Sequence, residues 1–589
     1  MELNRDDSGE ETAIKIGIVG CGSRGLTVLE RLCALAAIGS RPVEITVYDP
    51  HRPGPGVHSV EQPEYLMLNT VASQISMFPD QAALGGFGGR QGPDFYEWCV
   101  RFKSTGRALR ANEFLPRQWL GEYLAWTYDV VIAGLPSHVT VIHQALAVDN
   151  VERDDAGGFV LTAQGSKYSV DWLVLTVGHA AAAPVVDNRA QVTRLHWAYP
   201  QPFSLEGIDA GIAVGVEGLG LSAMDVVAGL TVGRGGRFVH NADQSLRYEP
   251  SGNEPRVFMF SRSGLPFRTR PDIHAYRVAA PALIFTLSAV DELRAAHPLG
   301  LDFEAHVLPL IKAEMLAHYF GMIGALRGEC ATSIMEEVAA AFYSQKVQSK
   351  AAELAQRFGV QGLDPSVFDP QYLTAPVEHY QDWVKAFISA DVQESLADLD
   401  HSPVKAAVEV WRSCREQLRR VVDNHGLTAD SHRVFFSQYA PLVNRMVAGP
   451  QKERHQELLA LAEAGIVQWV HSSRVLRNEG DRSVSIRAQG RGEAVTLDAL
   501  VYAHVHDNRN AANQPKVVSH LREIGVIHSL TPDGFGLNVD GNCKALPNLW
   551  ITGPIVEGAT YYNHYVPSSG SYSRAFVDAD RIAREILGL

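Results

Sequence analysis

Three closely spaced glycines, Gly20, Gly22 and Gly25, stand between an apolar run and a helical pattern. In such a turn the first glycine permits a tight bend, and the second lets a phosphate group approach the backbone. The third lets helix and strand pack closely. The start of the helix adds unpaired N–H groups and the positive end of the helix dipole. The spacing therefore predicts a phosphate-binding site; an ordinary strand-to-helix turn is the alternative.

The elements around this turn have the order of a nucleotide-binding unit. Residues 14–19 predict a buried parallel strand, and the following helix is expected to run to about Ala37. A second strand, Val43–Tyr48, ends at Asp49, which comes 24 residues after Gly25. This is near the usual spacing of about 20, at which a carboxylate accepts hydrogen bonds from a ribose. We therefore expect a bound dinucleotide.

A second turn of the same kind, Gly218-Leu219-Gly220-Leu221-Ser222-Ala223, follows another apolar run. The next predicted strand, Val257–Phe260, ends in Ser261-Arg262-Ser263-Gly264 instead of an acid. A guanidinium pairs with the 2′-phosphate of NADPH, which a carboxylate would repel. A solvated arginine in a turn is the alternative. The predicted NADPH contacts are Gly218, Gly220, Leu221, Ser222, Arg262 and Ser263.

Two such units in one chain suit a protein in which one unit holds a flavin and the other admits NADPH to reduce it. Residues 172–179 predict a strand that returns beneath the first unit, with Leu500–His506 as its partner. The run Asn548–Gly553, with Pro554 and a helix from about Ser571, predicts backbone N–H groups at the flavin end. The FAD contacts expected from these elements are Gly20, Gly22, Ser23, Arg24, Gly25, Asp49, Gly178, Gly553 and Pro554.

The order of these pieces resembles that of flavoproteins with two dinucleotide-binding domains. The stretches GIVGCGSRGLTVLERL and GVEGLGLSAMDVVAGLTVGRGGRF are similar to the bacterial FAD/NAD(P)-binding family that includes flavin-dependent nitrosuccinate synthases. The resemblance implies a monooxygenase that uses FAD, NADPH and O₂ to oxidise the amino nitrogen of a small amino acid, with L-aspartate and nitrosuccinate as the best guess.

A further similarity concerns the stretch LMLNTVASQISMFPD and the helix FLPRQWLGEYLAW. Both resemble segments of the N-hydroxylases that act on ornithine and lysine, where they lie beside the flavin. The resemblance implies cofactor contacts by Asn69, Gln74 and Arg117, with Gln74 also catalytic. Those enzymes have a substrate-binding lysine where this chain has Pro79, so an ornithine-like substrate pose is not expected.

The substrate carboxylates need cations, and the reacting amine must be neutral. The candidate cations are Arg268, Arg270, Arg445, Lys452 and Arg454, of which we assign Arg270, Arg445 and Lys452 to the substrate. The late loop Gly558–Gly570 follows the flavin-contacting turn, so we assign Asn563 and His564 to the catalytic pocket. For each residue, a solvated or structural side chain is the alternative; His179 and His504 are expected to be structural.

The middle of the chain has helical periodicity from about Ala279 to Asn424. We interpret it as a helical insertion, either a lid or a subunit contact. The predicted fold is α/β, with two Rossmann-like domains, the second inserted in the first, plus this insertion. The predicted segments are 12–208 (FAD), 209–278 (NADPH), 279–424 (helical), 425–494 (NADPH return) and 495–589 (FAD return).

Composition excludes several other classes. A length of 589 residues suits two or three domains, and a net charge of −14 argues against nucleic acid or an anionic membrane as partner. We expect no signal peptide, membrane span or metal, and a cytoplasmic protein for which a homo-oligomer is an open option. None of the six cysteines forms CxxC, which removes disulfide reductases. The open alternatives are another flavin amine oxidoreductase, an N-hydroxylase of a different amino acid, and a non-catalytic nucleotide-binding module.

Overall fold

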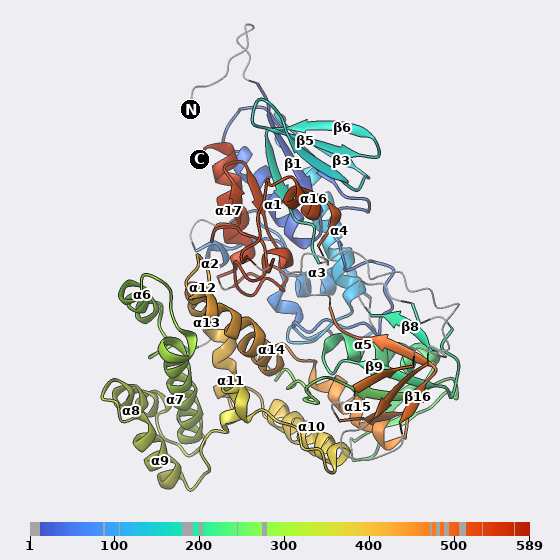
Figure 1. Ribbon diagram of the computed structural model, residues 1–589, viewed down its shortest axis with the longest axis vertical. Helices are drawn as coiled ribbons and strands as arrows, with labels where there is room; N and C mark the ends of the chain where they lie inside the picture. The colour runs from blue at the N-terminus through green and yellow to red at the C-terminus, as the bar shows by residue number, and fades with distance from the viewer. Residues whose placement is uncertain are drawn as a thin grey trace. The chain divides into compact units, whose positions relative to one another are not determined.

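In the computed structural model the chain forms two compact units, residues 1–182 with 506–589 and residues 183–505. Each has a parallel sheet with helices, so the predicted α/β fold with one unit inserted in the other is confirmed (Figure 1). The five predicted segment boundaries stay a prediction. The structure describes residues 12–85, 89–104, 106–179, 193–198, 204–205, 207–243, 245–271, 273, 280–471, 474–478, 483–487, 494–505, 514–532, 534–570 and 572–589.

The first unit is built on a six-stranded sheet. In pairing order its strands are β18 (Lys544–Leu546), β19 (Leu549–Ile551), β7 (Trp172–Leu175), β1 (Ile14–Val19), β2 (Val43–Tyr48) and β3 (Val139–Gln144). All neighbours pair in parallel except β18 and β19. Strand β1 is buried except at Lys15, as expected for the centre of a parallel sheet. The carboxyl ends of β19, β7, β1 and β2 therefore meet at one edge.

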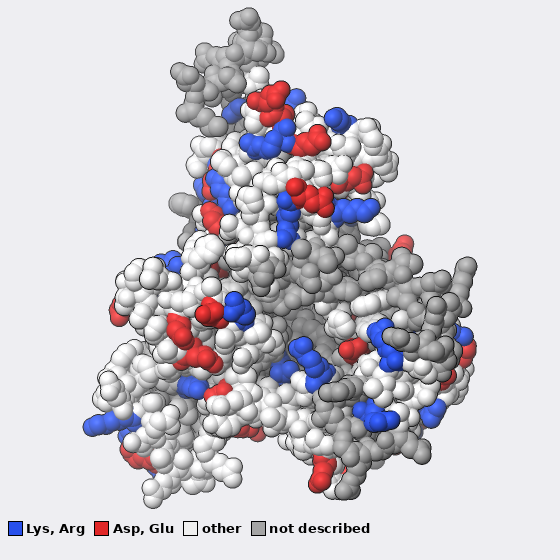
Figure 2. All heavy atoms as spheres, in the orientation of Figure 1, with Lys and Arg blue, Asp and Glu red and all other residues white. Residues whose placement is uncertain are grey.

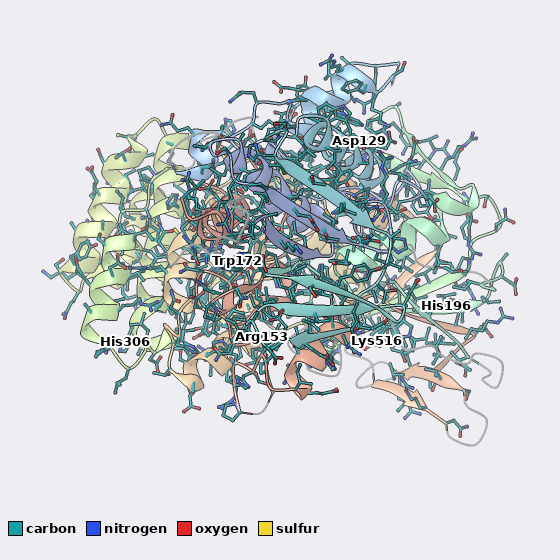
Figure 3. The ribbon with its side chains drawn as sticks, turned by 90° about the horizontal axis from the view of Figure 1, so that it is seen from above. Asp129, Arg153, Trp172, His196, His306 and Lys516 are labelled. Atoms are coloured by element: carbon teal, nitrogen blue, oxygen red, sulfur yellow. The ribbon has the colours of Figure 1, made fainter. Side chains whose placement is uncertain are left out.

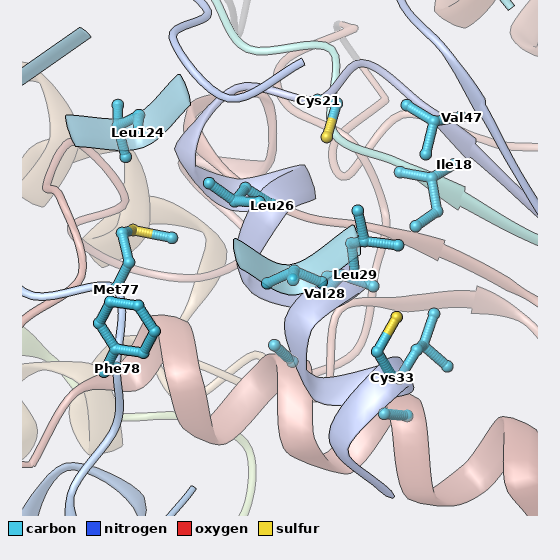
Figure 4. Close-up of a cluster of buried hydrophobic side chains, with 14 of the residues drawn as sticks. Ile18, Cys21, Leu26, Val28, Leu29, Cys33, Val47, Met77, Phe78 and Leu124 are labelled. Atoms are coloured by element: carbon cyan, nitrogen blue, oxygen red, sulfur yellow. The ribbon is translucent and has the colours of Figure 1, made fainter. Parts of the chain in front are cut away.

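Helix α1 (Ser23–Ala36) lies between this sheet and α17 (Arg574–Leu587). Its Leu26, Leu29 and Cys33 recur at helical spacing and are fully buried in a cluster with Ile18 and Val47 (Figure 4). Burying this apolar stripe fixes the helix, and with it the glycine turn from which the helix starts. The other helices of the unit are α2 (Gln81–Leu84), α3 (Phe95–Phe102), α4 (Arg117–Ala133) and α16 (Lys516–Glu523).

A small antiparallel sheet completes the first unit. Its strands are β4 (Asn150–Arg153), β5 (Phe159–Ala163) and β6 (Ser166–Val170). Strand β4 packs against α16, and Figure 3 labels Arg153 and Lys516 on these two elements. Arg153 donates a hydrogen bond to Asn548 Oδ1 at 2.8 Å, just before β19. The small sheet is thereby tied to the strand that leads to Gly553.

The second unit has a five-stranded parallel sheet in the order β13 (Val467–Trp469), β12 (Arg256–Phe260), β9 (Ala213–Glu217), β17 (Ala499–Tyr502) and β8 (Arg194–Trp197). Helix α5 (Leu221–Leu230) follows β9 through the second glycine turn. The unit also has a hairpin, β10 (Arg237–His240) with β11 (Leu246–Glu249), and a small sheet of β14 (Arg474–Arg477), β15 (Val484–Arg487) and β16 (Val495–Leu497).

The prediction that Leu500–His506 pairs with the strand at residues 172–179 was wrong. Strand β17 (Ala499–Tyr502), within the run assigned to that role, pairs with β9 and β8 in the second unit, whereas β7 pairs with β1 and β19. All four residues of β17 are buried. An apolar run of this kind fits the centre of any parallel sheet, so its composition does not identify its neighbours.

The helical insertion is confirmed. Its helices and those that return to the sheet are α6 (Leu287–Ala296), α7 (Leu308–Leu326), α8 (Ala331–Tyr343), α9 (Val347–Phe358), α10 (Tyr380–Leu396), α11 (Pro403–Ser413), α12 (Arg415–Val422), α13 (Ala429–Val434), α14 (Ala440–Val447) and α15 (Lys452–Glu463). Among the described residues no helix has the length and apolar character needed to cross a membrane.

Figure 2 shows one face of the molecule, on which acidic and basic side chains of the described residues are interspersed.

Candidate functional site

The first glycine turn has the backbone that its three glycines predict. Gly20 has φ +85°, and a Cβ there would lie 2.6 Å from the carbonyl oxygen of Thr176. A Cβ at Gly25 would lie 2.7 Å from Thr176 Oγ1 and closer still to the carbonyl oxygen of Gly20. The turn is therefore packed against the end of β7, and side chains at these two positions would displace backbone.

A proline- and glycine-rich loop covers this turn. The Gly54 N–H donates to the Cys21 carbonyl at 2.6 Å, and a Cβ on Gly56 would lie 2.8 Å from the Cα of Gly22. Asp49 accepts from the Cys21 N–H at 2.7 Å through Oδ2 and from the His51 N–H at 2.9 Å through Oδ1. Each carboxylate oxygen still has lone-pair capacity for a ribose hydroxyl. Asp49 thus shapes the turn, and its contact with a ribose stays a prediction.

The start of α1 fits a bound phosphate. Its N-cap is Gly22, which has no side chain to cap the helix, and the first turn has no acidic residue. Arg24 is buried, and among the described residues its Nε has no hydrogen-bond partner. Bare N–H groups at a helix start and an unsatisfied guanidinium nitrogen suit an anion. The residues present therefore fit the pyrophosphate of a dinucleotide such as FAD.

The other two predicted glycines lie at the same edge of the sheet. Gly178 (φ +73°) follows β7, and Gly553 (φ +96°) follows β19, with Pro554 at the start of a short 3₁₀ turn. The Thr552 N–H donates to the Leu175 carbonyl at 3.0 Å, which holds the two strand ends together. A Cβ at Gly178 would meet nothing within 4 Å, so this glycine serves the backbone conformation.

The segments of Asn69, Gln74 and Arg117 lie side by side. The Leu68 N–H donates to the Leu115 carbonyl at 2.9 Å, and the Arg117 N–H donates to the Leu66 carbonyl at 2.8 Å. Gln74 ends a 3₁₀ turn in the same segment. The Ser76 N–H then donates to the Pro567 carbonyl at 3.1 Å. The structure thus brings together two regions of the first unit that were singled out separately, residues 66–80 and the late loop.

The side chain of Asn563 holds the late loop in shape. Its Nδ2 donates to Glu557 Oε2 at 3.1 Å and to Thr560 Oγ1 at 3.0 Å, and its N–H donates to Glu557 Oε2 at 2.8 Å. Arg24 Nη2 donates to the Asn563 carbonyl at 3.1 Å, and its guanidinium lies 4.2 Å from the centre of the Tyr565 ring. Glu557, which organises the loop, was missed by the sequence analysis because nothing in its local pattern distinguishes it.

Three histidines belong to this region. The His564 ring stacks on His179 at 5.2 Å between centroids. Burial, with the neighbouring His564, lowers the pKa of His179 to about 3. Burial and the positive charge of Arg117 lower the pKa of His58 to about 4. His58 and His179 are therefore neutral near pH 7. The sequence analysis missed His58, because its burial results from the packing of α4 on its loop.

We expect His58 to make the protein less stable in mild acid. Between its unfolded pKa of 6.5 and its folded pKa of about 4, the unfolded chain binds a proton that the folded chain does not. Stability is therefore complete above pH 6.5 and falls as the pH falls through this window, by about 3 kcal/mol in all. Urea unfolding of the native protein and of His58→Gln at about pH 7 and about pH 5 should show a smaller acid loss in the variant.

The carboxyl group of Asp94 acts in the opposite direction, because burial raises its pKa to about 6. The group is present in both proteins and cancels in the comparison. An equal acid loss in the native protein and in His58→Gln would contradict the role given to His58.

The second glycine turn repeats the geometry of the first. Gly218 has φ +150°, and a Cβ there would press on the Ala503 carbonyl after β17. Gly220 is the N-cap of α5, again without a side-chain cap, and Leu221 and Ser222 begin the helix. A Cβ on Gly220 would lie 3.1 Å from the ring of Phe267. This turn also fits a dinucleotide phosphate at a bare helix start.

Arg262 and Ser263 lie directly after β12 and are exposed. Ser263 Oγ accepts from the Leu265 N–H at 3.3 Å and lies 3.5 Å from Arg445 Nη2. The structure thus places Arg445, which was assigned to the substrate, beside the residues assigned to the 2′-phosphate of NADPH.

All five candidate substrate cations have hydrogen-bond partners within the second unit, and the partner of Arg445 is Ser263. Arg268 donates to Asp391 Oδ1 at 2.8 Å, Lys452 donates to Glu453 Oε1 at 2.7 Å, and Arg454 donates to Glu457 Oε2 at 2.5 Å. Arg270 is buried, with its N–H on the Pro450 carbonyl at 2.8 Å and Nη1 3.4 Å from the Val447 carbonyl. The assignment of Arg270 and Lys452 to the substrate stays a prediction.

Arg270 also lines a small cavity that is rich in cations. Lys405 and Arg412 lie on its wall with Arg270, and Glu409 is its one acid among the described residues. The described residues contain no group of three or more His, Cys, Asp or Glu side chains placed to hold a metal ion, and all six cysteines are free.

The two glycine turns define a protein with two dinucleotide-binding folds, and residues 17–180 match a family described as FAD-NAD(P)-binding. The chain is 32% identical to an L-aspartate N-monooxygenase (nitrosuccinate-forming) of Streptomyces cremeus, over 98% of this chain and 95% of that protein. It is 29% identical to a nitrosuccinic acid synthase of Aspergillus oryzae, over 98% and 93%. The chain belongs to the FAD/NAD(P)-binding N-monooxygenase family of these relatives. The resemblance found in the sequence is thereby confirmed.

Among solved structures, a cadaverine monooxygenase of the desferrioxamine biosynthetic pathway from Erwinia amylovora, bound to FAD, superposes with a TM-score of 0.46. It is 11% identical, and the match covers 98% of this chain and 95% of that one.

Proposed function

We propose that this chain is an FAD- and NADPH-dependent monooxygenase that oxidises the amino nitrogen of L-aspartate to nitrosuccinate. The observation that carries the proposal is the similarity to nitrosuccinate-forming enzymes over nearly the whole chain. Two glycine turns with uncapped helix starts support it, because a protein that only senses one nucleotide needs one of them. The free cysteines agree with a reducing cytoplasm.

In this proposal the first unit holds FAD, and the second unit holds NADPH. Bound FAD would supply the redox and oxygen chemistry, with NADPH as the source of the hydride. The N–H groups at the start of α1 and the guanidinium of Arg24 bind the pyrophosphate, and Asp49 accepts from the ribose. Asn69, Gln74 and Arg117 border the flavin on adjoining segments.

The remaining residues prepare the substrate. Its ammonium group has to lose a proton before the nitrogen can react, and we assign this proton to His564, whose ring is held by stacking on His179. Asn563 acts through the loop that carries His564 and is a positioning residue. For a substrate carboxylate we assign Arg270, whose cavity also has Lys405 and Arg412 on its wall.

The test is NADPH consumption and O₂ uptake by the FAD-loaded protein with L-aspartate and with a panel of other amino acids, together with product mass. We expect aspartate to stimulate both rates and to yield products with oxygen on nitrogen. Stimulation by another amino acid alone would assign a different substrate. NADPH oxidation that no amino acid changes, without an oxygenated product, would refute the proposal and favour a flavin reductase.

A further inference from the structure

Arg445 is fixed against the segment that follows β12. It lies near the end of α14, and its carbonyl accepts the Arg268 N–H at 2.9 Å. Its Nη2 lies 3.5 Å from Ser263 Oγ, and its guanidinium lies 5.9 Å from the centre of the Phe267 ring. The same ring borders Gly220 in the second glycine turn. The guanidinium therefore belongs to the edge of the sheet at which the second nucleotide is expected.

Arg445 differs from the neighbouring cations in its pairing with carboxylates. Arg268, Lys452 and Arg454 each pair with a carboxylate. Among the described residues no carboxylate pairs with Arg445, and its buried Nε has no hydrogen-bond partner. Burial lowers the pKa of this guanidinium to about 10. A half-buried cation without a counter-ion is costly unless an anion arrives to pair with it.

The place of this cation indicates which anion would arrive. Ser263 directly follows Arg262 at the end of β12, and the residues after the second strand of a dinucleotide-binding fold contact the adenosine ribose. A phosphate on that ribose carries nearly two negative charges, which two guanidinium groups and a hydroxyl can match. A substrate carboxylate would carry one negative charge and does not require the neighbouring Ser263 and Arg262.

We propose that Arg445 is a second ligand for the 2′-phosphate of NADPH, together with Arg262 and Ser263, and that it selects NADPH over NADH. This replaces its assignment to the substrate carboxylate, and it rests on the proposed function, in which the second unit binds NADPH. The selecting cation then comes from α14, far along the chain from the glycine turn that it serves.

The test compares 2′,5′-ADP with 5′-AMP as calorimetric ligands of the full-length protein, because the two differ only in the 2′-phosphate. Arg445→Ala should weaken the binding of 2′,5′-ADP by at least about tenfold, as expected for a lost charge-assisted hydrogen bond, and leave the affinity for 5′-AMP unchanged. Arg445→Lys, which keeps the charge, should lose less of the affinity for 2′,5′-ADP. The control is Arg256→Ala, at the opposite end of β12, where the guanidinium donates to the Gly211 carbonyl at 3.2 Å; it should change neither affinity.

Equal weakening of both ligands by Arg445→Ala would overturn the proposal, because the 2′-phosphate would then not be the group that Arg445 contacts. Unchanged binding of 2′,5′-ADP with a raised KM for aspartate would also overturn it and restore the substrate role. If Arg445→Ala does not fold, Arg445→Gln and Arg445→Lys give the same comparison. Selective loss of 2′,5′-ADP in a protein that does not oxidise aspartate would support this site and refute the proposed function.

Discussion

Gly25→Ala is expected to yield a protein that retains little or no FAD. The new Cβ would lie 2.7 Å from Thr176 Oγ1 and closer still to the Gly20 carbonyl oxygen, which is backbone and cannot rotate away. Helix α1 would have to move from β1, and the N–H groups at its start would leave the position that the phosphates need. We expect the flavin content per protein to fall by at least about tenfold, equivalent to about 1.4 kcal/mol or more in binding.

Flavin absorbance relative to protein, followed by titration with added FAD, measures this effect. The matched control is Gly39→Ala, shortly after the end of the same helix, where a Cβ would lie 4.0 Å from the Ala36 carbonyl oxygen. It should retain FAD like the native protein. Full flavin content in Gly25→Ala would show that the turn tolerates a side chain and that its packing does not govern the cofactor.

Asp391→Ala is expected to lower the free energy of unfolding of the second unit by about 3–5 kcal/mol, the usual cost of removing one partner from a buried ion pair. Asp391 is buried and accepts from Lys405 Nζ at 2.9 Å, Arg268 Nη1 at 2.8 Å and the Thr269 N–H at 2.6 Å. Removing the carboxylate would leave the Lys405 ammonium, only 2% exposed, without its counter-ion.

Urea unfolding of the variants is the measurement. Asp391→Leu combined with Lys405→Met should be more stable than Asp391→Ala, because no buried lysine charge then remains unpaired. The control is Asp430→Ala, which removes an exposed carboxylate paired with Arg433 on α13 and should barely change stability. Equal losses for the buried and exposed carboxylates would contradict this account.

The contribution of Asp391 to the free energy of unfolding depends on pH in a definite direction. Lys405 and Arg268 lower the pKa of Asp391 below its usual 3.8, although burial alone would raise it. The contribution is therefore fully present above the unfolded pKa and is lost only as the pH falls through the folded value. Between pH 5 and 8 the contribution of the ionised Asp391 carboxylate in the native protein should therefore stay constant, unlike that of His58.

Local patterns predicted the elements that are built from contiguous residues. Strands β1 and β2 have the predicted limits, and β12 begins one residue earlier than predicted. Apolar runs bounded by turn residues contain that information. The partner of β17 could not be predicted, because its all-buried composition suits either sheet. Choosing between them depends on contacts far along the chain.

The residues of the candidate site also fall into two groups, those that a local pattern predicted and those that it did not. The glycines of both turns were found from their spacing: Gly20 and Gly218 take a positive φ that favours glycine, and Gly25 has no room for a Cβ. The burial of His58 and the position of Arg445 beside Ser263 depend on tertiary packing, so spacing along the chain does not indicate them. Glu557 acts within its own loop, but nothing in its local pattern distinguishes it from other glutamates. Asn563 was singled out for chemistry on the basis of its loop, but its amide is used to hold that loop together.

The pairing of β8 with β17 bears on how the two units could have been combined. These are the first and last strands of the second unit's sheet, and they are parallel neighbours over Arg194–Trp197 and Ala499–Tyr502. The point at which the chain enters this sheet and the point at which it leaves are thus only about 13 Å apart, the length of a four-residue strand. A domain with adjacent ends can be transplanted as one cassette into a single surface loop of a host. The same closeness makes the second unit a natural candidate for circular permutation or for expression on its own.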